Sequence, residues 1–253
     1  MMTQVKTATE ILAIRESGRM TAAILETLQA YSVVGVSTKD IAVVAARETK
    51  AMGASAPFLG YQGFPDVICV SLNDEVVHGI PKPDRIIRDG DLVSLDFGVK
   101  WHGMVTDSSI TFIVGKPKSP KHLELIKYTE QSLEEGIAAV RDGVRTGDIG
   151  AAVQAVLERH HYGIVRELVG HGVGHLLHED PNIPNYGKEH TGPWLKAGMT
   201  IAIEPMATLG SERVVVDSDR WTVRTQDGSM SAHFEHSILI TKDGREILTH
   251  IEK

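Results

Sequence analysis

Residues 92–114, LVSLDFGVKWHGMVTDSSITFIV, place two aspartates in otherwise strand-like sequence. Trp101–Gly103 make a bend between two segments that are otherwise typical of β-strands packed in a core. Asp96 lies in the first segment and Asp107 in the second. A carboxylate in apolar surroundings is costly to bury unless a cation or hydrogen bonds compensate its charge. We therefore expect both aspartates to have a function.

Strand alternation predicts which way the acidic side chains point. The apolar residues of the first strand share one face, so Asp96 points the other way, and Asp107 does the same in the second strand. Downstream, Glu204 in TIAIEPMA and Glu235 in SAHFEHSILI also lie opposite apolar neighbours. If these strands form one sheet, the four acids point into a common cavity.

A glycine-rich segment, GHGVGHLLHED, adds His171 and His178 to these acids. Carboxylate oxygens with one imidazole suit Mn, Fe, Co or Zn, and they differ from a sulfur-rich structural zinc site. Two such cations lower the pKa of a bridging water and supply hydroxide near neutral pH. A single zinc on a helical His-x-x-x-His, from His171 to His175, is the alternative. Two glycines in this segment disfavour a helix there.

The other histidines and the cysteine give weaker signals. His78, in the turn VVHGIP, has no acid at ligand spacing, and its local sequence alone indicates a surface histidine. The remaining histidines, including His102, His160 and His161, are expected to be solvated. Cys69 is the only cysteine, so it excludes an intrachain disulfide, and it is expected to be a small buried residue.

The composition indicates an ordinary globular protein. The 253 residues are 42% hydrophobic and 23% charged, enough for a sizeable core. A formal net charge of -7 argues against a dedicated nucleic-acid or membrane-surface binder. No apolar run approaches the ~20 residues of a spanning helix, and the N-terminal residues have no signal-peptide pattern. We expect a cytoplasmic protein.

A short motif occurs twice in the chain. V-x-T-x-D-I begins at Val36 and again at Val144, and each copy starts a helix. Two similar helix caps would give the same motif, but the order helix, helix, strands also occurs twice. We therefore predict one α+β domain over residues 1–253, with related halves at about 9–115 and 119–253 and a site at their seam. Apolar spacing and capping residues predict four helices, at about 9–31, 37–53, 119–140 and 146–160.

The full set of motifs resembles type I methionine aminopeptidase, a member of the pita-bread metallopeptidases. The similarity runs over nearly the whole chain and is carried by VVHGIP, LDFG with TDSS, GHGVG with HE, IEP, and the glutamate before HSILIT. The resemblance implies a central antiparallel sheet flanked by helices, built from two pseudosymmetric halves. It also implies a metallo-exopeptidase that removes the initiator methionine from nascent proteins with a small second residue, by attack of a metal-bridging hydroxide.

The resemblance assigns five metal ligands: Asp96, Asp107, His171, Glu204 and Glu235. They would hold two divalent ions per chain, with Co, Mn, Fe, Zn or Ni all open. Asp96 resembles the chelating ligand of one metal, and Asp107 and Glu235 resemble the bridging ligands. His171 and Glu204 resemble ligands of the other metal, and Glu204 is also the general base.

The resemblance also assigns substrate contacts. His178 would donate to the substrate carbonyl as it becomes an oxyanion, and His78 would contact the substrate amide, which overturns the interpretation of His78 as a surface histidine. Phe58 stands where a cysteine is frequent, and Leu177 where a phenylalanine is frequent, so the shape of the pocket entrance is in doubt. The pocket for the methionine side chain would involve Tyr61, Phe64, Cys69 and Trp221.

The implied partners are nascent polypeptide N-termini, with docking at the ribosome left open. We expect no DNA or membrane partner, and we expect a monomer. One alternative is a proline-directed relative, an aminopeptidase P or prolidase. Those usually carry a separate N-terminal domain, for which Asp96 comes too early. The other is a non-enzymatic pita-bread module that binds peptides or nucleoprotein, although such proteins tend to lose ligands that are all present here.

Overall fold

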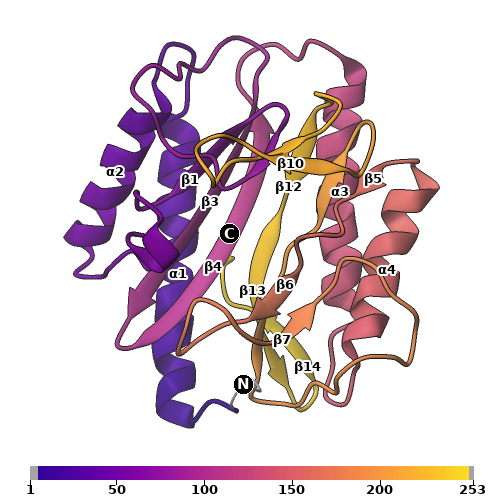
Figure 1. Cartoon of the computed structure of the whole chain (residues 1–253). Coiled ribbons are helices and arrows are strands. Elements are labelled where there is room, and N and C mark those ends of the chain that lie inside the picture. The colour runs from indigo at the N-terminus through magenta and orange to yellow at the C-terminus, as the bar shows by residue number, and fades with distance from the viewer. Residues whose placement is uncertain (1–4, 251–253) are drawn as a thin grey trace.

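The structure is a computed structural model that describes residues 5–250. Two pairs of helices lie behind a curved layer of strands (Figure 1). Within the described residues these are α1 (Ala8–Tyr31), α2 (Thr38–Ala51), α3 (Pro120–Ala138) and α4 (Thr146–Arg159). All four predicted helices are confirmed, with their ends within two residues of the predicted positions. No helix in this part of the chain is both long and apolar enough to cross a membrane.

The strands form one large and two small antiparallel sheets. The large sheet contains β1 (Cys69–Leu72), β3 (Leu92–Trp101), β4 (Met104–Ile113), β6 (Gly170–Gly172), β7 (Glu179–Ile183), β8 (Thr200–Ile203), β13 (Glu235–Thr241) and β14 (Gly244–Ile247). Its order is β1-β3-β4-β13-β8-β6-β7, with β14 beside β13. The small sheets, β10-β11-β2 and β12-β9-β5, contain β2 (Glu75–Val77), β5 (Gly163–Ile164), β9 (Met206–Thr208), β10 (Val214–Val216), β11 (Val223–Thr225) and β12 (Ser231–His233).

Strand alternation decides which face of the large sheet is packed. Val93, Leu95 and Phe97 of β3 are fully buried in a core cluster with residues of α1 and α2. Ile201 and Ile203 of β8 are buried in a second cluster with residues of α3 and α4. Each such side chain contributes roughly 1.5–3 kcal/mol by leaving water. Both helix pairs therefore pack against the apolar side chains of the sheet, and the polar side chains of the same strands point to the opposite face.

The two halves of the chain repeat their connections at a constant spacing. Each half has an isolated β-bridge just before its second helix, joining Ser37 to Ile86 and Arg145 to Trp194. Equivalent residues of these bridges are 108 positions apart, as are the two copies of V-x-T-x-D-I. Asp96 and Glu204 are also 108 positions apart. Two of the predicted site acids thus have the same spacing as the two β-bridges and the two copies of the motif.

Candidate functional site

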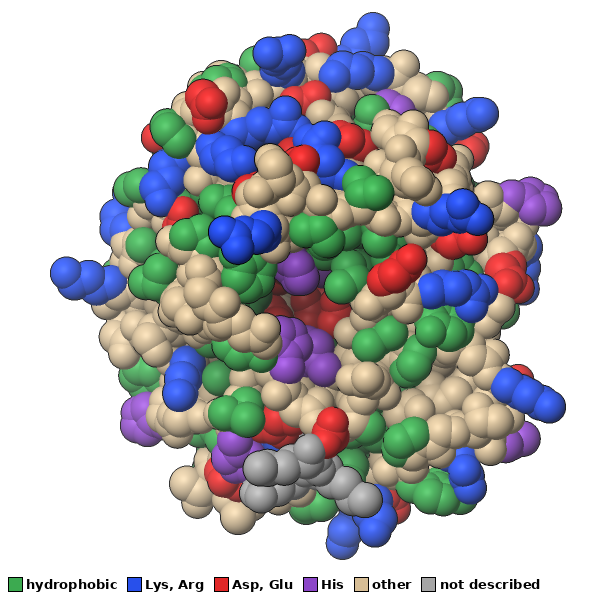
Figure 2. All heavy atoms as spheres, in the orientation of Figure 1, with side chains coloured by type: hydrophobic (Ala, Val, Ile, Leu, Met, Phe, Trp, Pro, Cys, Tyr) green, Lys and Arg blue, Asp and Glu red, His purple; other side chains and the backbone are tan. Residues whose placement is uncertain are grey.

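A pocket of about 190 Å³ opens on the face of the large sheet that the helices leave uncovered. Figure 2 shows a hollow in the middle of this face, with acidic and histidine side chains at its floor and hydrophobic side chains around it. Every residue predicted for the site lines this pocket: Tyr61, Phe64, Cys69, His78, Asp96, Asp107, His171, His178, Glu204, Trp221 and Glu235. The fold therefore brings together residues from both halves of the chain.

Three acids reach the pocket from neighbouring strands of the sheet. Ser109 of β4 pairs with Asp96 of β3 on one side and with Glu235 of β13 on the other. Asp107 lies two residues before Ser109 on β4, so it projects from the same face. The three carboxylates are buried, with Glu235 only 2% exposed. The antiparallel register thus places carboxylates from distant segments side by side.

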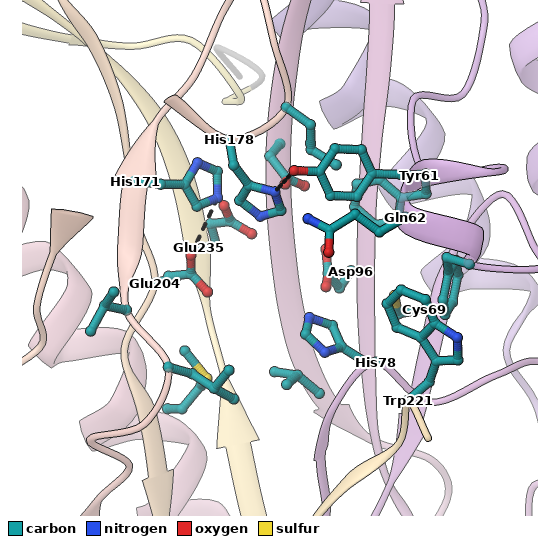
Figure 3. A pocket seen from close by; sticks show the side chains of 18 residues that line it. Tyr61, Gln62, Cys69, His78, Asp96, His171, His178, Glu204, Trp221 and Glu235 are labelled. Atoms are coloured by element: carbon teal, nitrogen blue, oxygen red, sulfur yellow. Dashed lines mark hydrogen bonds and ion pairs between the residues drawn. The ribbon is translucent and has the colours of Figure 1, made fainter. Parts of the chain in front are cut away.

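His171 and Glu204 complete the floor of the pocket from the second half. His171 lies in β6 and Glu204 directly follows β8, two strands that pair with each other. His171 Nε2 lies 3.4 Å from Glu204 Oε1 (Figure 3). One ligand atom each of Asp107, His171 and Glu235 lies within 4.8 Å of the others. This spacing suits side chains that share one cation.

The pKa values of these groups show the cost of gathering acids in a buried place. Burial, followed by repulsion from neighbouring acids, raises the pKa of Asp96, Glu204 and Glu235 well above the ordinary range. Burial also raises the pKa of Asp107 to about 7. Burial and the nearby His178 lower the pKa of His171 to about 3. In their charged form the acids therefore need positive charge that no residue lining this pocket provides within residues 5–250.

The donor atoms of the floor fit divalent cations. Among the described residues, Asp96 Oδ1 and Glu235 Oε1 are buried without a hydrogen-bond partner. Buried acceptors of this kind are unfavourable unless a partner is supplied. Four carboxylates with one neutral imidazole are the ligands that Mn, Fe, Co and Zn accept, and the site has no thiolate donor set of a structural zinc centre. The floor of the pocket is therefore a candidate metal centre.

Two more histidines lie above the floor. His178 Nδ1 is 2.7 Å from the Tyr61 hydroxyl, and its ring packs edge-on against His171 at 4.2 Å between centroids (Figure 3). His78 has a left-handed backbone, with φ 59°, and its ring lies 6.3 Å from that of Trp221. Burial, with a smaller effect of His178, lowers the pKa of His78 to about 4. The interpretation of His78 as a surface histidine is wrong, because the turn that carries it folds over the pocket.

The side of the pocket near η1 (Tyr61–Gly63) is apolar. Phe64 and Trp221 pack edge to face with centroids 5.2 Å apart. One hydrophobic cluster forms this side of the pocket and includes Phe58, Tyr61, Phe64, Cys69, Leu177 and Trp221. Phe58 and Leu177, the two departures from the common bacterial pattern, are both buried in it and line the pocket. An apolar wall thus faces the acidic floor.

Sequence reasoning missed several residues at or near the site. The expectation that the remaining histidines are solvated is wrong for His122, His233 and His236, which are buried or nearly so. His233 lies beside Glu204, with Nε2 3.6 Å from Oε2. Its position two residues before Glu235 in the sequence was the available signal that it lies near the site. Gln62 also lines the pocket, and only its place beside Tyr61 could have indicated it.

A buried ion pair holds the loop that carries His178. Lys6 Nζ lies 2.9 Å from Glu179 Oε2, and the two side chains are 0% and 8% exposed. The other oxygen of Glu179 accepts hydrogen bonds from the backbone N–H groups of His175 and Leu176, at 2.6 and 3.0 Å. The N-terminal segment therefore fixes the loop through one carboxylate.

Replacing Lys6 by methionine should lower the free energy of unfolding by roughly 3–5 kcal/mol, because Glu179 would stay buried without its cation. Denaturant titration of the metal-free protein measures this change. Arg19→Met is the matched control, because it removes the exposed pair of Arg19 with Glu16 and should change stability by less than about 0.5 kcal/mol. Similar small effects of both substitutions would contradict the role of Lys6.

Comparison with known proteins places this chain among metallopeptidases. Residues 13–242 match the family model described as Metallopeptidase family M24. Methionine aminopeptidase 1 of Bacillus subtilis is 46% identical over 246 residues, which cover 97% of this chain and 98% of that protein. Methionine aminopeptidase of Aquifex aeolicus is 42% identical over 250 residues, covering 96% of each chain.

Solved structures agree on the fold. The crystal structure of methionine aminopeptidase from Thermotoga maritima matches with a TM-score of 0.97 and 42% identity, covering 99% of this chain and 100% of that one. The prolidase from Pyrococcus horikoshii matches with a TM-score of 0.79 at 22% identity, a likeness that concerns the fold alone. This chain covers only 64% of that prolidase. The predicted α+β pita-bread fold is confirmed.

Proposed function

Because this chain belongs to Metallopeptidase family M24, we propose that its pocket is the active site of a methionine aminopeptidase that removes the initiator methionine from nascent proteins with a small second residue. The chain is a methionyl aminopeptidase, a metal-dependent hydrolase, by its similarity to the curated relatives. The observation that carries the finer proposal is the group of four carboxylates and one imidazole, all buried except the half-buried Glu204, below an apolar wall.

We propose that Asp96, Asp107, His171, Glu204 and Glu235 hold two divalent ions, drawn from Co, Mn, Fe, Zn or Ni. Bound there, such ions would lower the pKa of a shared water to give hydroxide for attack on the scissile carbonyl. Glu204 is proposed to take a proton, and two observations support this: its carboxylate lines the pocket, and its pKa is raised by burial and by Asp107 and Asp96. A raised pKa suits a general base that works near neutral pH.

His178 is proposed to donate a hydrogen bond to the substrate carbonyl oxygen. His178 Nδ1 lies 2.7 Å from the Tyr61 hydroxyl, and we propose that this hydroxyl donates to Nδ1, which leaves the ring proton on Nε2. Burial lowers the pKa of His178, so the ring is a neutral donor. His78, from the opposite side of the pocket, is proposed to contact the substrate amide (Figure 3).

The substitution His178→Ala should lower kcat by about 10²–10³-fold, the usual effect of losing one oxyanion donor. His175→Ala is the matched control, because His175 lies in the same loop but bonds Glu10 outside the pocket, with Nε2 2.7 Å from Oε1. Steady-state kinetics on one peptide compares the two variants. A kcat of His178→Ala close to that of His175→Ala would refute the role of His178.

The apolar wall supports methionine as the residue removed. An unbranched thioether fits an apolar pocket lined by Phe64, Cys69 and Trp221. One methylene more or less changes binding by only ~1–3 kcal/mol, so related side chains should be cut slowly rather than not at all. Phe58 and Leu177 line this wall and depart from the common bacterial pattern. Cleavage rates of close analogues of methionine are therefore the informative measure of how these two side chains change the width of the pocket.

A peptide panel tests the proposed function. With Mn²⁺, Co²⁺, Fe²⁺, Zn²⁺ or Ni²⁺ supplied in turn, Met-Ala and Met-Gly peptides should release methionine, whereas Met-Lys peptides should not. A chelator should stop turnover, and metal should restore it. Hydrolysis of an X-Pro dipeptide in place of Met-Ala would identify a proline-directed enzyme. Failure to bind any of these ions would favour a non-enzymatic module instead.

The partners, the location and the oligomeric state of the enzyme follow from the same proposal. Nascent N-termini are its proposed partners, and we propose that it acts in the cytoplasm as a monomer. The chain is proposed to work as a single catalytic domain, because acids from both halves are needed at one floor. Sedimentation and activity can be measured on one sample. We expect the protein to sediment with the mass of a monomer and to show full activity.

A further inference from the structure

His233 is a buried histidine whose ring has no hydrogen bond. Among the described residues, neither Nδ1 nor Nε2 has a hydrogen-bond partner, and the side chain is only 2% exposed. Buried polar atoms in proteins are nearly always paired, so an unpaired ring indicates a partner in another state of the site. The ring does not line the pocket, and a carboxylate of the protein, that of Glu204, lies beside it.

The carboxylate of Glu204 is the group that His233 faces. His233 Nε2 lies 3.6 Å from Glu204 Oε2, beyond hydrogen-bond distance but within a small movement of it. The other oxygen, Oε1, lies 3.4 Å from His171 Nε2. The two oxygens of Glu204 therefore each face a different imidazole, one on the pocket floor and one behind it.

The backbone of His233 is held firmly. Its N–H donates to Thr111 Oγ1 at 2.9 Å, and its carbonyl accepts from the same hydroxyl at 2.7 Å. Pairing of β12 with β9 sets His233 opposite Met206, two residues after Glu204. The strand register, rather than a mobile loop, thus presents the ring to Glu204.

We propose that His233 is a positioning residue for Glu204. In the metal-loaded site its Nε2–H donates to Glu204 Oε2 and so keeps Oε1 on the side of His171. The inference rests on the proposed role of Glu204 as ligand and base. Groups that orient a metal ligand from behind typically change metal affinity or activity by 10–100-fold when removed.

Two amide substitutions test the position of this donor. His233→Gln can place an amide N–H near the position of Nε2, whereas the shorter His233→Asn cannot reach it. The Gln variant should keep the Mn²⁺ Kd of the apoprotein and the kcat on a Met-Ala peptide within about threefold of the parent. The Asn variant should weaken Mn²⁺ binding by about 10–100-fold and lower kcat, with KM changed less than about threefold. The control is His122, another buried histidine with an unpaired ring nitrogen. His122→Gln should leave the Mn²⁺ Kd and kcat equal to those of the parent.

Two results would overturn the proposal: an Asn variant equal to the parent, or Gln and Asn variants impaired alike, which would show a role in packing only. If the parent binds Mn²⁺ but cuts no Met peptide, the proposed function fails, and the Mn²⁺ affinities of the variants still decide the inference.

¹⁵N spectra of the unaltered Zn²⁺-loaded protein give a check that needs no folded Asn variant. The His233 signal, assigned by its loss in His233→Gln, should be that of the Nε2–H tautomer, and the Nδ1–H tautomer would overturn the proposal.

Discussion

Replacing Asp107 by asparagine should abolish methionine release while leaving a folded protein. Asp107 is buried on β4, and its ligand atom lies within 4.8 Å of those of His171 and Glu235, so it is proposed to hold a cation together with them. Loss of one oxyanion donor commonly costs 10²–10³ in kcat, and loss of a carboxylate ligand would also weaken the binding of the cations that would activate water. We expect kcat to fall by at least about 10³-fold.

The same substitution should not destabilise the metal-free protein. Burial raises the pKa of Asp107 to about 7, so the apoprotein resists ionisation of this carboxyl. A neutral amide of similar shape removes that unfavourable charge. Scanning calorimetry of the apoprotein should show an unfolding midpoint at or above that of the parent, and Mn²⁺ should no longer raise it.

Asp91→Asn is the control for Asp107→Asn. Although burial opposes it, hydrogen bonds from the Arg88 N–H and from Lys118 hold the pKa of Asp91 below its ordinary value. Asp91 is buried but does not line the pocket. Its substitution should keep metal-dependent activity and lower the free energy of unfolding by roughly 1–3 kcal/mol. An active Asp107→Asn variant, or an inactive Asp91→Asn variant, would contradict the assigned site.

Affinity for Mn²⁺ should fall at least about tenfold for each pH unit below 7. Cations bind the ionised carboxylates, so protons compete wherever the pKa is raised. Asp107, with a pKa of about 7, binds a proton below that pH, and Asp96, Glu204 and Glu235 have raised values as well. His171, whose pKa is lowered to about 3, stays neutral and does not compete. Titration calorimetry between pH 6 and 8 measures the slope.

Stability of the metal-free protein should change in the opposite direction. An acid whose pKa is raised by folding stabilises the folded state at low pH, and this contribution is lost as the pH rises through the folded-state value. For Asp107 the contribution is complete below about pH 4 and disappears as the pH passes about 7. Added Mn²⁺ should therefore raise the unfolding midpoint most at pH 8. A Kd that is the same at pH 6 and pH 8 would show that these acids do not bind the metal.

The sequence by itself determined the local structure of the chain. The capping box at Ser37 and Asp40 begins α2, and Pro120 begins α3, because caps depend only on neighbours within one helical turn. Alternation along β3 was enough to separate the face packed against the helices from the face of Asp96. The ordered motifs also indicated the family and the four acids and one imidazole of the floor.

Only the tertiary structure decided which of these residues meet and which other residues support them. The row of Asp96, Ser109 and Glu235 depends on the register of three strands. The pairing of Lys6 with Glu179 joins residues 173 positions apart, and His233 reaches Glu204 through a separate small sheet. Such contacts arise from strand register and packing between distant segments, which no short stretch of sequence encodes. Local propensity therefore fixed the elements, and long-range packing fixed the site.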